Sequence, residues 1–237
     1  MDSKLKNVWD KHAKSYCSMN EVYMKKNEIK KSKDPIILWL REIKSKNKGK
    51  KLKVLDAGGG IGQYVNVLDI LGFNAIGLDI SKEAVRIAKE NWLNVILGDM
   101  RELPFKNNSF DVVIAGGSLE HFTETEVALR EIARVLKPEG IFIGNVPNRW
   151  GIFILTKVIQ QALGLWKCGY EKSFSKDSLL NIFHKNGLKI IDIKQSEWTI
   201  GRHVILSKIL RFFDNSLKAI SLGGPHHYFY AIKIIKA

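Results

Sequence analysis

The segment Val54-Leu-Asp-Ala-Gly-Gly-Gly-Ile-Gly62 decides the fold expected for this chain. Its apolar start and glycine-rich end are typical of a buried strand that turns sharply into a helix. Gly58, Gly60 and Gly62 let the backbone turn tightly and approach a ligand closely, where free N–H groups at the helix start point outward. A tight turn with a purely structural role is the alternative interpretation.

Strand and helix patterns alternate on both sides of this segment. Strands are predicted over residues 53–56, 74–79, 95–97, 110–115, 141–144, 188–193 and 228–235. Helices are predicted from an N-cap at Ser81 through Trp92, over residues 125–136 and near residues 203–220. This spacing indicates βαβ units with right-handed crossovers, and therefore a mostly parallel sheet with helices on both faces.

The charge at the glycine loop indicates which ligand it accepts. Asp56 precedes the glycines, where a carboxylate would repel a pyrophosphate but attract an ammonium or sulfonium group. The glycine spacing is GxGxG rather than the dinucleotide pattern GxGxxG, because Gln63 occupies the sixth position. Both features disfavour an NAD-dependent oxidoreductase.

Carboxylates also follow the next two predicted strands. Asp79 ends the second strand, 17 residues past Gly62, which suits a carboxylate that binds two ribose hydroxyls. Asp99 ends the third strand and could accept a hydrogen bond from an exocyclic amine, while Ile80 and Met100 could sandwich a flat base. Each aspartate alone could be a helix cap, but three at successive strand ends predict a nucleoside site.

These motifs resemble the class I S-adenosylmethionine-dependent methyltransferases, and most closely the type 11 subgroup. The resemblance covers about residues 50–147 and rests on Asp56–Gly62, Asp79, Gly98-Asp-Met100, Phe110–Ile114 and Leu119-Glu-His121. It implies a Rossmann-like, seven-stranded sheet whose last strand is antiparallel, with N-terminal helices and a helical cap inserted after the fifth strand.

The resemblance also assigns cofactor contacts residue by residue. Asp56 with Gly58, Gly60 and Gly62 would hold the methionine part of S-adenosylmethionine. Asp79 would bind the ribose, and Asp99 with Met100 the adenine. The remaining residues that it places at the cofactor are Tyr16, Ile80 and Ala115, and Tyr16 would fold over the methionine end.

By the same resemblance, the reaction is in-line methyl transfer to an O, N or C atom of a small-molecule or lipid-like acceptor. The product of the cofactor would be S-adenosylhomocysteine. His121, with Glu120 behind it, is the best-placed general base if the acceptor must lose a proton. A histidine that only starts a helix is an equally open interpretation, as is a cofactor-binding protein without catalysis.

Composition sets the domain organisation and the compartment that we expect. The 237 residues, 45% of them hydrophobic, fit one domain. We divide it into an N-terminal helical cap (1–50), a cofactor-binding core (51–148), a cap insertion (149–180) and C-terminal strands with a helix (181–237). Only Cys17 and Cys168 are cysteines, so we expect no metal site and a cytoplasmic protein. Neither a signal peptide nor a transmembrane segment is expected.

The net charge of +14 is unevenly distributed, at +10 over residues 1–53, −4 over 54–150 and +8 over 151–237. Basic flanks suit an anionic partner, and an RNA-directed methyltransferase or RNA-binding protein is therefore a rival interpretation. Of the 38 basic residues, however, 30 are lysines, which also suits an ordinary solvated surface and disfavours nucleic acid.

The segment Trp150–Trp166 carries apolar residues at helical spacing. One predicted face holds Leu155, Val158, Ile159, Ala162, Leu163 and Trp166. Either this helix is a cap packed over the active site, or it is a surface helix that meets a membrane or a lipid-like substrate. The second interpretation would make the protein a peripheral membrane protein.

Overall fold

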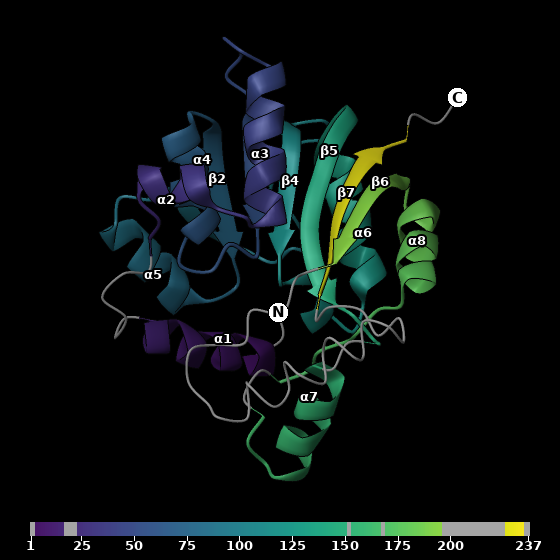
Figure 1. The fold of residues 1–237 in the computed structure, drawn as a ribbon. Coiled ribbons are helices and arrows are strands. Elements are labelled where there is room, and N and C mark those ends of the chain that lie inside the picture. The colour runs from purple at the N-terminus through teal and green to yellow at the C-terminus, as the bar shows by residue number, and fades with distance from the viewer. Residues whose placement is uncertain (1–2, 17–22, 151–152, 167–168, 196–225, 235–237) are drawn as a thin grey trace.

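A single twisted sheet organises the computed structural model, which describes residues 3–16, 23–150, 153–166, 169–195 and 226–234 (Figure 1). Its strands are β1 (Lys53–Ala57), β2 (Asn74–Asp79), β3 (Val95–Leu97), β4 (Phe110–Gly116), β5 (Leu136–Pro147), β6 (Leu188–Gln195) and β7 (His226–Lys233). The seven described strands lie in the order β3-β2-β1-β4-β5-β7-β6. All neighbouring pairs are parallel except those that β7 makes with β5 and β6. The predicted Rossmann-like sheet with an antiparallel last strand is confirmed.

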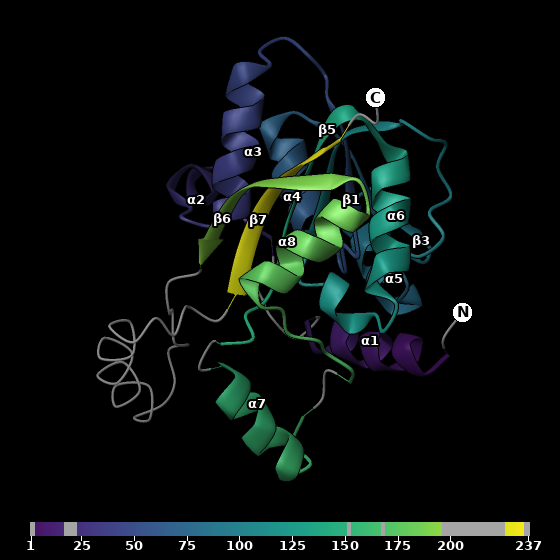
Figure 2. The ribbon, with the colours of Figure 1, turned by 90° about the vertical axis from the view of Figure 1, so that its right-hand side faces the viewer.

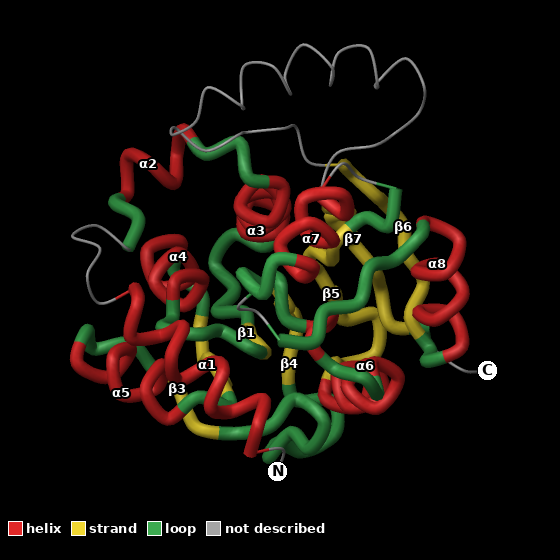
Figure 3. The backbone as a smooth tube through the Cα atoms, turned by 90° about the horizontal axis from the view of Figure 1, so that it is seen from below, coloured by secondary structure: helices red, strands yellow, loops and turns green. Residues whose placement is uncertain are grey.

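Helices cover both faces of the sheet, as Figures 1 and 2 show. They are α1 (Ser3–Tyr16), α2 (Lys26–Lys31), α3 (Pro35–Lys46), α4 (Gln63–Leu71), α5 (Lys82–Glu90), α6 (Thr125–Val135), α7 (Phe153–Ala162) and α8 (Lys176–Lys185), with a short 3-10 helix η1 (Leu119–His121). Helices α3, α4 and α5 pack on one face, and α6 and α8 pack on the other. Seen from below in Figure 3, α1 and α7 lie across the lower edge of the sheet.

Local sequence explains where the helices begin. Asp34 caps α3, because its Oδ1 accepts hydrogen bonds from the N–H groups of Ile36 (2.7 Å) and Ile37 (3.2 Å), with Pro35 at the first helical position. The predicted cap at Ser81 is confirmed, since its hydroxyl accepts from the N–H of Ala84 at 3.0 Å. Helix α4, by contrast, starts directly from the glycine turn, with Gly62 at its N-cap and no side-chain cap.

The alternation of side chains along β4 divides the core into two layers. Val113 and Ala115 face the layer of α6 and α8, whereas Val112 and Ile114 face that of α3 and α4. All four side chains are buried, which explains the continuous apolar run that marked this strand in the sequence.

Two boundaries differ from those predicted from the sequence, and one predicted helix cannot be compared with the structure. Strand β5 begins at Leu136 rather than Ile141, because Leu136 pairs with Phe110 across a bulge at the start of β4. The boundary predicted at residue 180 falls inside α8, and the helix predicted near 203–220 lies outside the described residues. Within the described part of the chain, no helix is both long and apolar enough to cross a membrane.

Candidate active site

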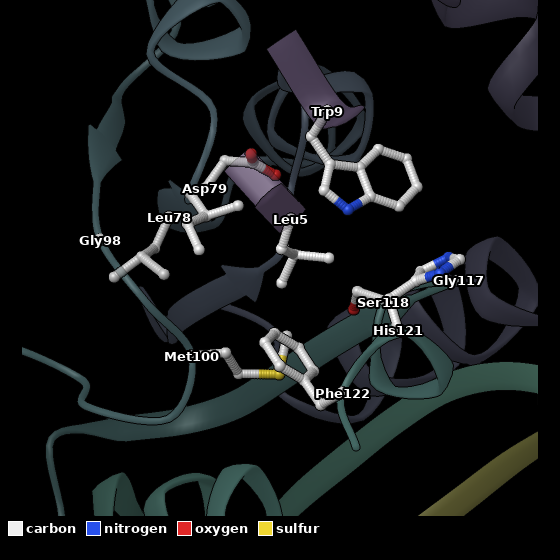
Figure 4. Close-up of a pocket in the computed structure, with 12 residues that line it drawn as sticks. Leu5, Trp9, Leu78, Asp79, Gly98, Met100, Gly117, Ser118, His121 and Phe122 are labelled. Atoms are coloured by element: carbon white, nitrogen blue, oxygen red, sulfur yellow. The ribbon is translucent and has the colours of Figure 1, made fainter. Parts of the chain in front are cut away.

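A cavity lies beyond the carboxyl ends of β1, β2 and β4, where α1 covers it (Figure 4). Its empty volume is about 450 Å³, including the part that is open to solvent. Five lining residues were predicted, namely Gly58, Asp79, Ile80, Met100 and His121. Seven were not, namely Leu5, Trp9, Leu78, Gly98, Gly117, Ser118 and Phe122. The strand ends therefore gather at one site, as the sequence predicted.

The three predicted loop glycines have positive φ angles and three different surroundings. Gly58 (φ +76°) sits so close to Ser118 that a Cβ there would lie 2.5 Å from the serine Cβ. Gly60 (φ +54°) faces open space, and its N–H donates to Oδ2 of Asp79 at 2.8 Å. Gly62 (φ +87°) packs against Leu93, which makes it a helix–sheet contact rather than part of the cavity lining.

Asp79 holds the loop and faces the cavity. Its Oδ1 accepts from the N–H of Ser81 at 2.8 Å, while Oδ2 accepts from Gly60. Burial raises the pKa of Asp79, and these backbone hydrogen bonds oppose the rise. Each carboxylate oxygen can accept more than one hydrogen bond, so a vicinal diol could still bind.

Asp56 is a buried carboxyl group beneath the glycine loop. Only 1% of it is exposed, and neither oxygen has a hydrogen-bond partner among the described residues. Burial, and secondarily the charge of Asp79, raises the pKa of Asp56 to about 7. It does not line the cavity directly. Neither carboxylate oxygen of Asp56 has a cationic partner among the described residues. A ligand that brings an ammonium group to the loop would supply one.

The other predicted cofactor residues are less directly placed. Burial raises the pKa of Asp99, but hydrogen bonds from Arg101 outweigh this effect and lower it, with Nη2 of Arg101 only 2.7 Å from Oδ2. Asp99 does not line the cavity, whereas its neighbour Met100 does. Ala115 is buried within β4, away from the lining. Tyr16 ends α1, and its side chain lies outside the described residues.

His121 sits on η1 with a defined tautomer. Its Nδ1 lies 2.9 Å from the backbone oxygen of Tyr170, which can only accept, so Nδ1 carries the proton and Nε2 keeps a lone pair. The ring packs edge-on against Trp9 at 4.6 Å between centroids. Burial lowers the pKa of His121 to about 4, so the imidazole is neutral at pH 7.

Glu120 points into a different environment. It is 3% exposed, and one carboxylate oxygen has no hydrogen-bond partner among the described residues. Burial raises its pKa to about 8, with Glu171 reinforcing and Lys157 opposing the shift. The side chain does not line the cavity, so the structure separates it from His121.

A second cavity adjoins the first and shares Leu5, His121 and Phe122 with it. The remaining lining residues are Val8, Arg101, Thr123, Gly169 and Tyr170, and the empty volume is about 740 Å³. The two chambers thus meet at the neutral imidazole. Such a pair can hold two reactants with the reacting atoms near His121.

Helix α1 closes the first chamber through contacts that the sequence did not reveal. Leu5 and Trp9 line the cavity, as Figure 4 shows. Oδ1 of Asp10 accepts from the hydroxyl of Ser81 (2.6 Å) and from the N–H of Glu83 (3.1 Å). The resemblance predicted N-terminal helices, but only the docking of α1 on the start of α5 shows that this helix forms a wall of the site.

No cluster of three or more metal-ligating side chains occurs within the described residues.

A family model and several relatives indicate the family of this chain. A family model described as a methyltransferase domain matches residues 55–144. An uncharacterized protein of Methanocaldococcus jannaschii is 32% identical over 79% of this chain and 78% of its own length. A demethylmenaquinone methyltransferase of Streptomyces avermitilis is 33% identical over 44% of this chain and 46% of its own length. The chain spans about half the length of this and another relative that it matches.

A solved structure extends the likeness to nearly the whole chain. It is a complex between the Haloferax volcanii Trm112 methyltransferase activator and a putative methyltransferase. It matches with a TM-score of 0.68 and covers 99% of this chain and 98% of that one. At 18% identity this likeness shows the fold.

Proposed function

Since the chain belongs to the class I S-adenosylmethionine-dependent methyltransferases, we propose that it transfers a methyl group to a small or lipid-like acceptor. The observation that carries this proposal is the pair of adjoining cavities that meet at His121, with Asp79 in the lining of the first and the unpartnered Asp56 buried beneath the glycine loop. The cofactor would occupy the first cavity and the acceptor the second.

The cofactor's chemistry fits the residues present. When bound, S-adenosylmethionine supplies an activated methyl group, whose transfer breaks the carbon–sulfur bond and leaves S-adenosylhomocysteine. Asp79 would accept hydrogen bonds from the ribose hydroxyls, and Asp56 would compensate the amino group. Met100, Ile80 and Leu78 offer apolar contacts for the base. Asp99 would accept from the adenine amine while keeping its ion pair with Arg101.

His121 would accept a proton from the acceptor through Nε2 when the attacked atom is a protonated oxygen or nitrogen. A pKa of about 4 makes it a weak base, but one that is unprotonated throughout the physiological range. Glu120 would act only indirectly, since its side chain does not line either cavity. A His121→Gln variant should keep its affinity for S-adenosylhomocysteine and lose about 100-fold in turnover with such an acceptor.

The lining of the second cavity supports the class of acceptor. Among the described residues, its lining is apolar or aromatic at Leu5, Val8, Phe122 and Tyr170, and only Arg101 is charged. A small or lipid-like molecule with one polar end would fit this lining. The likeness to a demethylmenaquinone methyltransferase also supports a small molecule. RNA, suggested by the basic flanks, would need a more cationic cavity.

Calorimetric titration with S-adenosylmethionine, S-adenosylhomocysteine and NAD tests the proposal. We expect saturable binding of both sulfur nucleosides and none of NAD. Binding of NAD alone would contradict the proposed function. RNA retention in 200 mM salt would instead favour the nucleic-acid alternative, because phosphate-dominated binding weakens steeply with salt.

A further inference from the structure

Helix α7 departs from the usual surface pattern of a helix. Val158 and Ile159 in the helix, with Leu163 and Leu165 in the turn that follows, are between 49% and 65% exposed. Lys157, the charged residue of the helix, is only 7% exposed. A helix on a water-soluble surface normally buries the apolar residues and exposes the lysine. Figure 2 shows α7 standing away from the sheet and its covering helices.

Buried contacts fix this rotation of the helix. The Lys157 ammonium donates to the backbone oxygen of Glu171 and lies 3.2 Å from its Oε1. The same ammonium lies 5.3 Å from the ring centroid of Trp166. Turning the apolar face inward would expose these groups and break the pair, so the outward apolar face is a defined feature of the segment.

The exposed charges that directly flank α7 in the described chain are positive. Between residues 148 and 172 they are Arg149 and Lys172, and the exposed pair Lys176 and Asp177 that follows adds no net charge. The one carboxylate described between residues 148 and 172, on Glu171, is buried against Lys157. Trp150 and Tyr170 are exposed at the two ends of the segment. Apolar side chains, interfacial aromatics and cations without carboxylates are the surface that an anionic bilayer binds.

We propose that the exposed residues of α7 and its described flanks, residues 149–150, 158–166 and 169–172, dock the protein on an anionic lipid bilayer. The surface disfavours a second copy as the occupant, because a two-fold interface would bring like cations together. The loop that returns from α7 carries Gly169 and Tyr170, which line the second cavity. Docking would therefore bring the second cavity, where the acceptor is proposed to bind, to the lipid. That link to the acceptor rests on the proposed function, whereas the docking itself does not.

Vesicle co-sedimentation of the full chain tests the docking surface. We expect binding to vesicles of phosphatidylcholine with a quarter phosphatidylglycerol, and at least about tenfold weaker binding to pure phosphatidylcholine or in 500 mM salt. The variant Ile159→Glu/Leu163→Glu should lower partition to the anionic vesicles at least about tenfold. Its matched control is Leu180→Glu/Ile191→Glu, which makes the same substitutions at exposed positions of α8 and β6 and should bind normally.

A second measurement on the unaltered chain covers the case in which a variant folds poorly. Brominated lipid in the anionic vesicles should quench tryptophan fluorescence, since Trp150 is exposed beside α7. Absence of binding and quenching, or equal loss in both double variants, would overturn the proposal. A concentration-dependent dimer that only Ile159→Glu/Leu163→Glu abolishes would also overturn it and assign α7 to a contact between copies.

Titration of the same preparations with S-adenosylhomocysteine separates this inference from the proposed function. Nucleoside binding without vesicle binding would overturn the docking surface alone. Vesicle binding without nucleoside binding would leave the docking surface supported and overturn the methyltransferase proposal.

Discussion

Helices α6 and α7 use similar apolar spacing in opposite ways. In α6, Ala128, Leu129 and Ile132 are fully buried against the sheet. In α7, Val158 and Ile159 are exposed while Lys157 is buried. The same periodicity therefore predicts a helix in both cases but not which side meets the core. The difference shows that apolar packing holds α6 on the sheet, whereas a buried ion pair fixes the orientation of α7.

Breaking that ion pair should have the largest effect on stability. Lys157→Met would leave Glu171 charged and buried, and should lower the free energy of unfolding of the insertion by about 3–5 kcal/mol. Hydrogen exchange of amides in α7 measures this local stability. The double variant Lys157→Met/Glu171→Met should recover most of the loss, because it removes both charges.

Lys137→Met is a control for this prediction, since the pair of Lys137 with Asp111 is more exposed and should contribute less than about 1 kcal/mol. Equal effects of Lys157→Met and Lys137→Met would mean that α7 does not depend on its buried pair.

In the cofactor core, the largest effect should come from Asp79. Asp79→Ala removes the acceptor for the Gly60 and Ser81 N–H groups and for the ribose hydroxyls proposed to bind there. We expect S-adenosylhomocysteine affinity to fall about 100-fold, as titration calorimetry would show. Asp192→Ala, at the far edge of the sheet, is the control and should bind as the unaltered chain does. A tight-binding Asp79→Ala variant would refute the ribose assignment.

The raised pKa of Asp56 predicts a pH dependence of binding. Only the ionised carboxylate compensates an ammonium group, so affinity for S-adenosylhomocysteine should rise about tenfold between pH 6 and pH 8, across the pKa of about 7. Calorimetry at pH 6, 7 and 8 measures this change. Asp56→Asn should bind weakly with little pH dependence, whereas Glu120→Gln should keep the dependence. A flat profile for the unaltered chain would exclude Asp56 from cofactor binding.

The same pKa shift has the opposite consequence for the unliganded protein. The folded state holds the Asp56 proton more tightly than the unfolded chain, whose aspartates have a pKa near 3.9. Stability should therefore fall as the pH rises from about 4 to 7 and level off with respect to this group above 7. Denaturant unfolding of Asp56→Asn should show a smaller fall over this range.

Sequence alone predicted the sheet and the strand ends well, because both depend on local patterns. The run Val112–Ala115 is apolar on both faces, as a central parallel strand requires, and Asp79 ends its strand. Because the carboxyl ends of parallel strands meet at one edge of the sheet, the topology predicted that the site residues would lie close together. Gly62 shows the limit of such a prediction. The sequence identified it as a loop glycine, but its packing against Leu93 depends on a distant part of the chain and has no local signal.

The resemblance predicted an N-terminal helical cap with Tyr16 over the cofactor, but the residues that form the wall of the cavity could not be predicted, since they depend on contacts between distant segments. Leu5 and Trp9 reach the cavity only because Asp10 binds the start of α5, more than 70 positions later in the chain. Tyr170 orients His121 from the loop after α7. A single sequence contains no local signal for such pairs, whereas co-variation among relatives would reveal them.

The smallest change in stability is expected at Ile159 in α7, and the same substitution in α6 provides a direct comparison. Ile159→Ala removes a side chain that is 49% exposed, and alanine favours the helix slightly, so global stability should change by less than about 0.5 kcal/mol. Ile132→Ala, the same substitution at a fully buried position of α6, should cost about 2–5 kcal/mol, because it leaves a cavity in the core. Denaturant unfolding of both variants measures the contrast. Similar costs would mean that Ile159 is covered in solution, and the apolar face of α7 would then be part of the folded core rather than a surface for lipid.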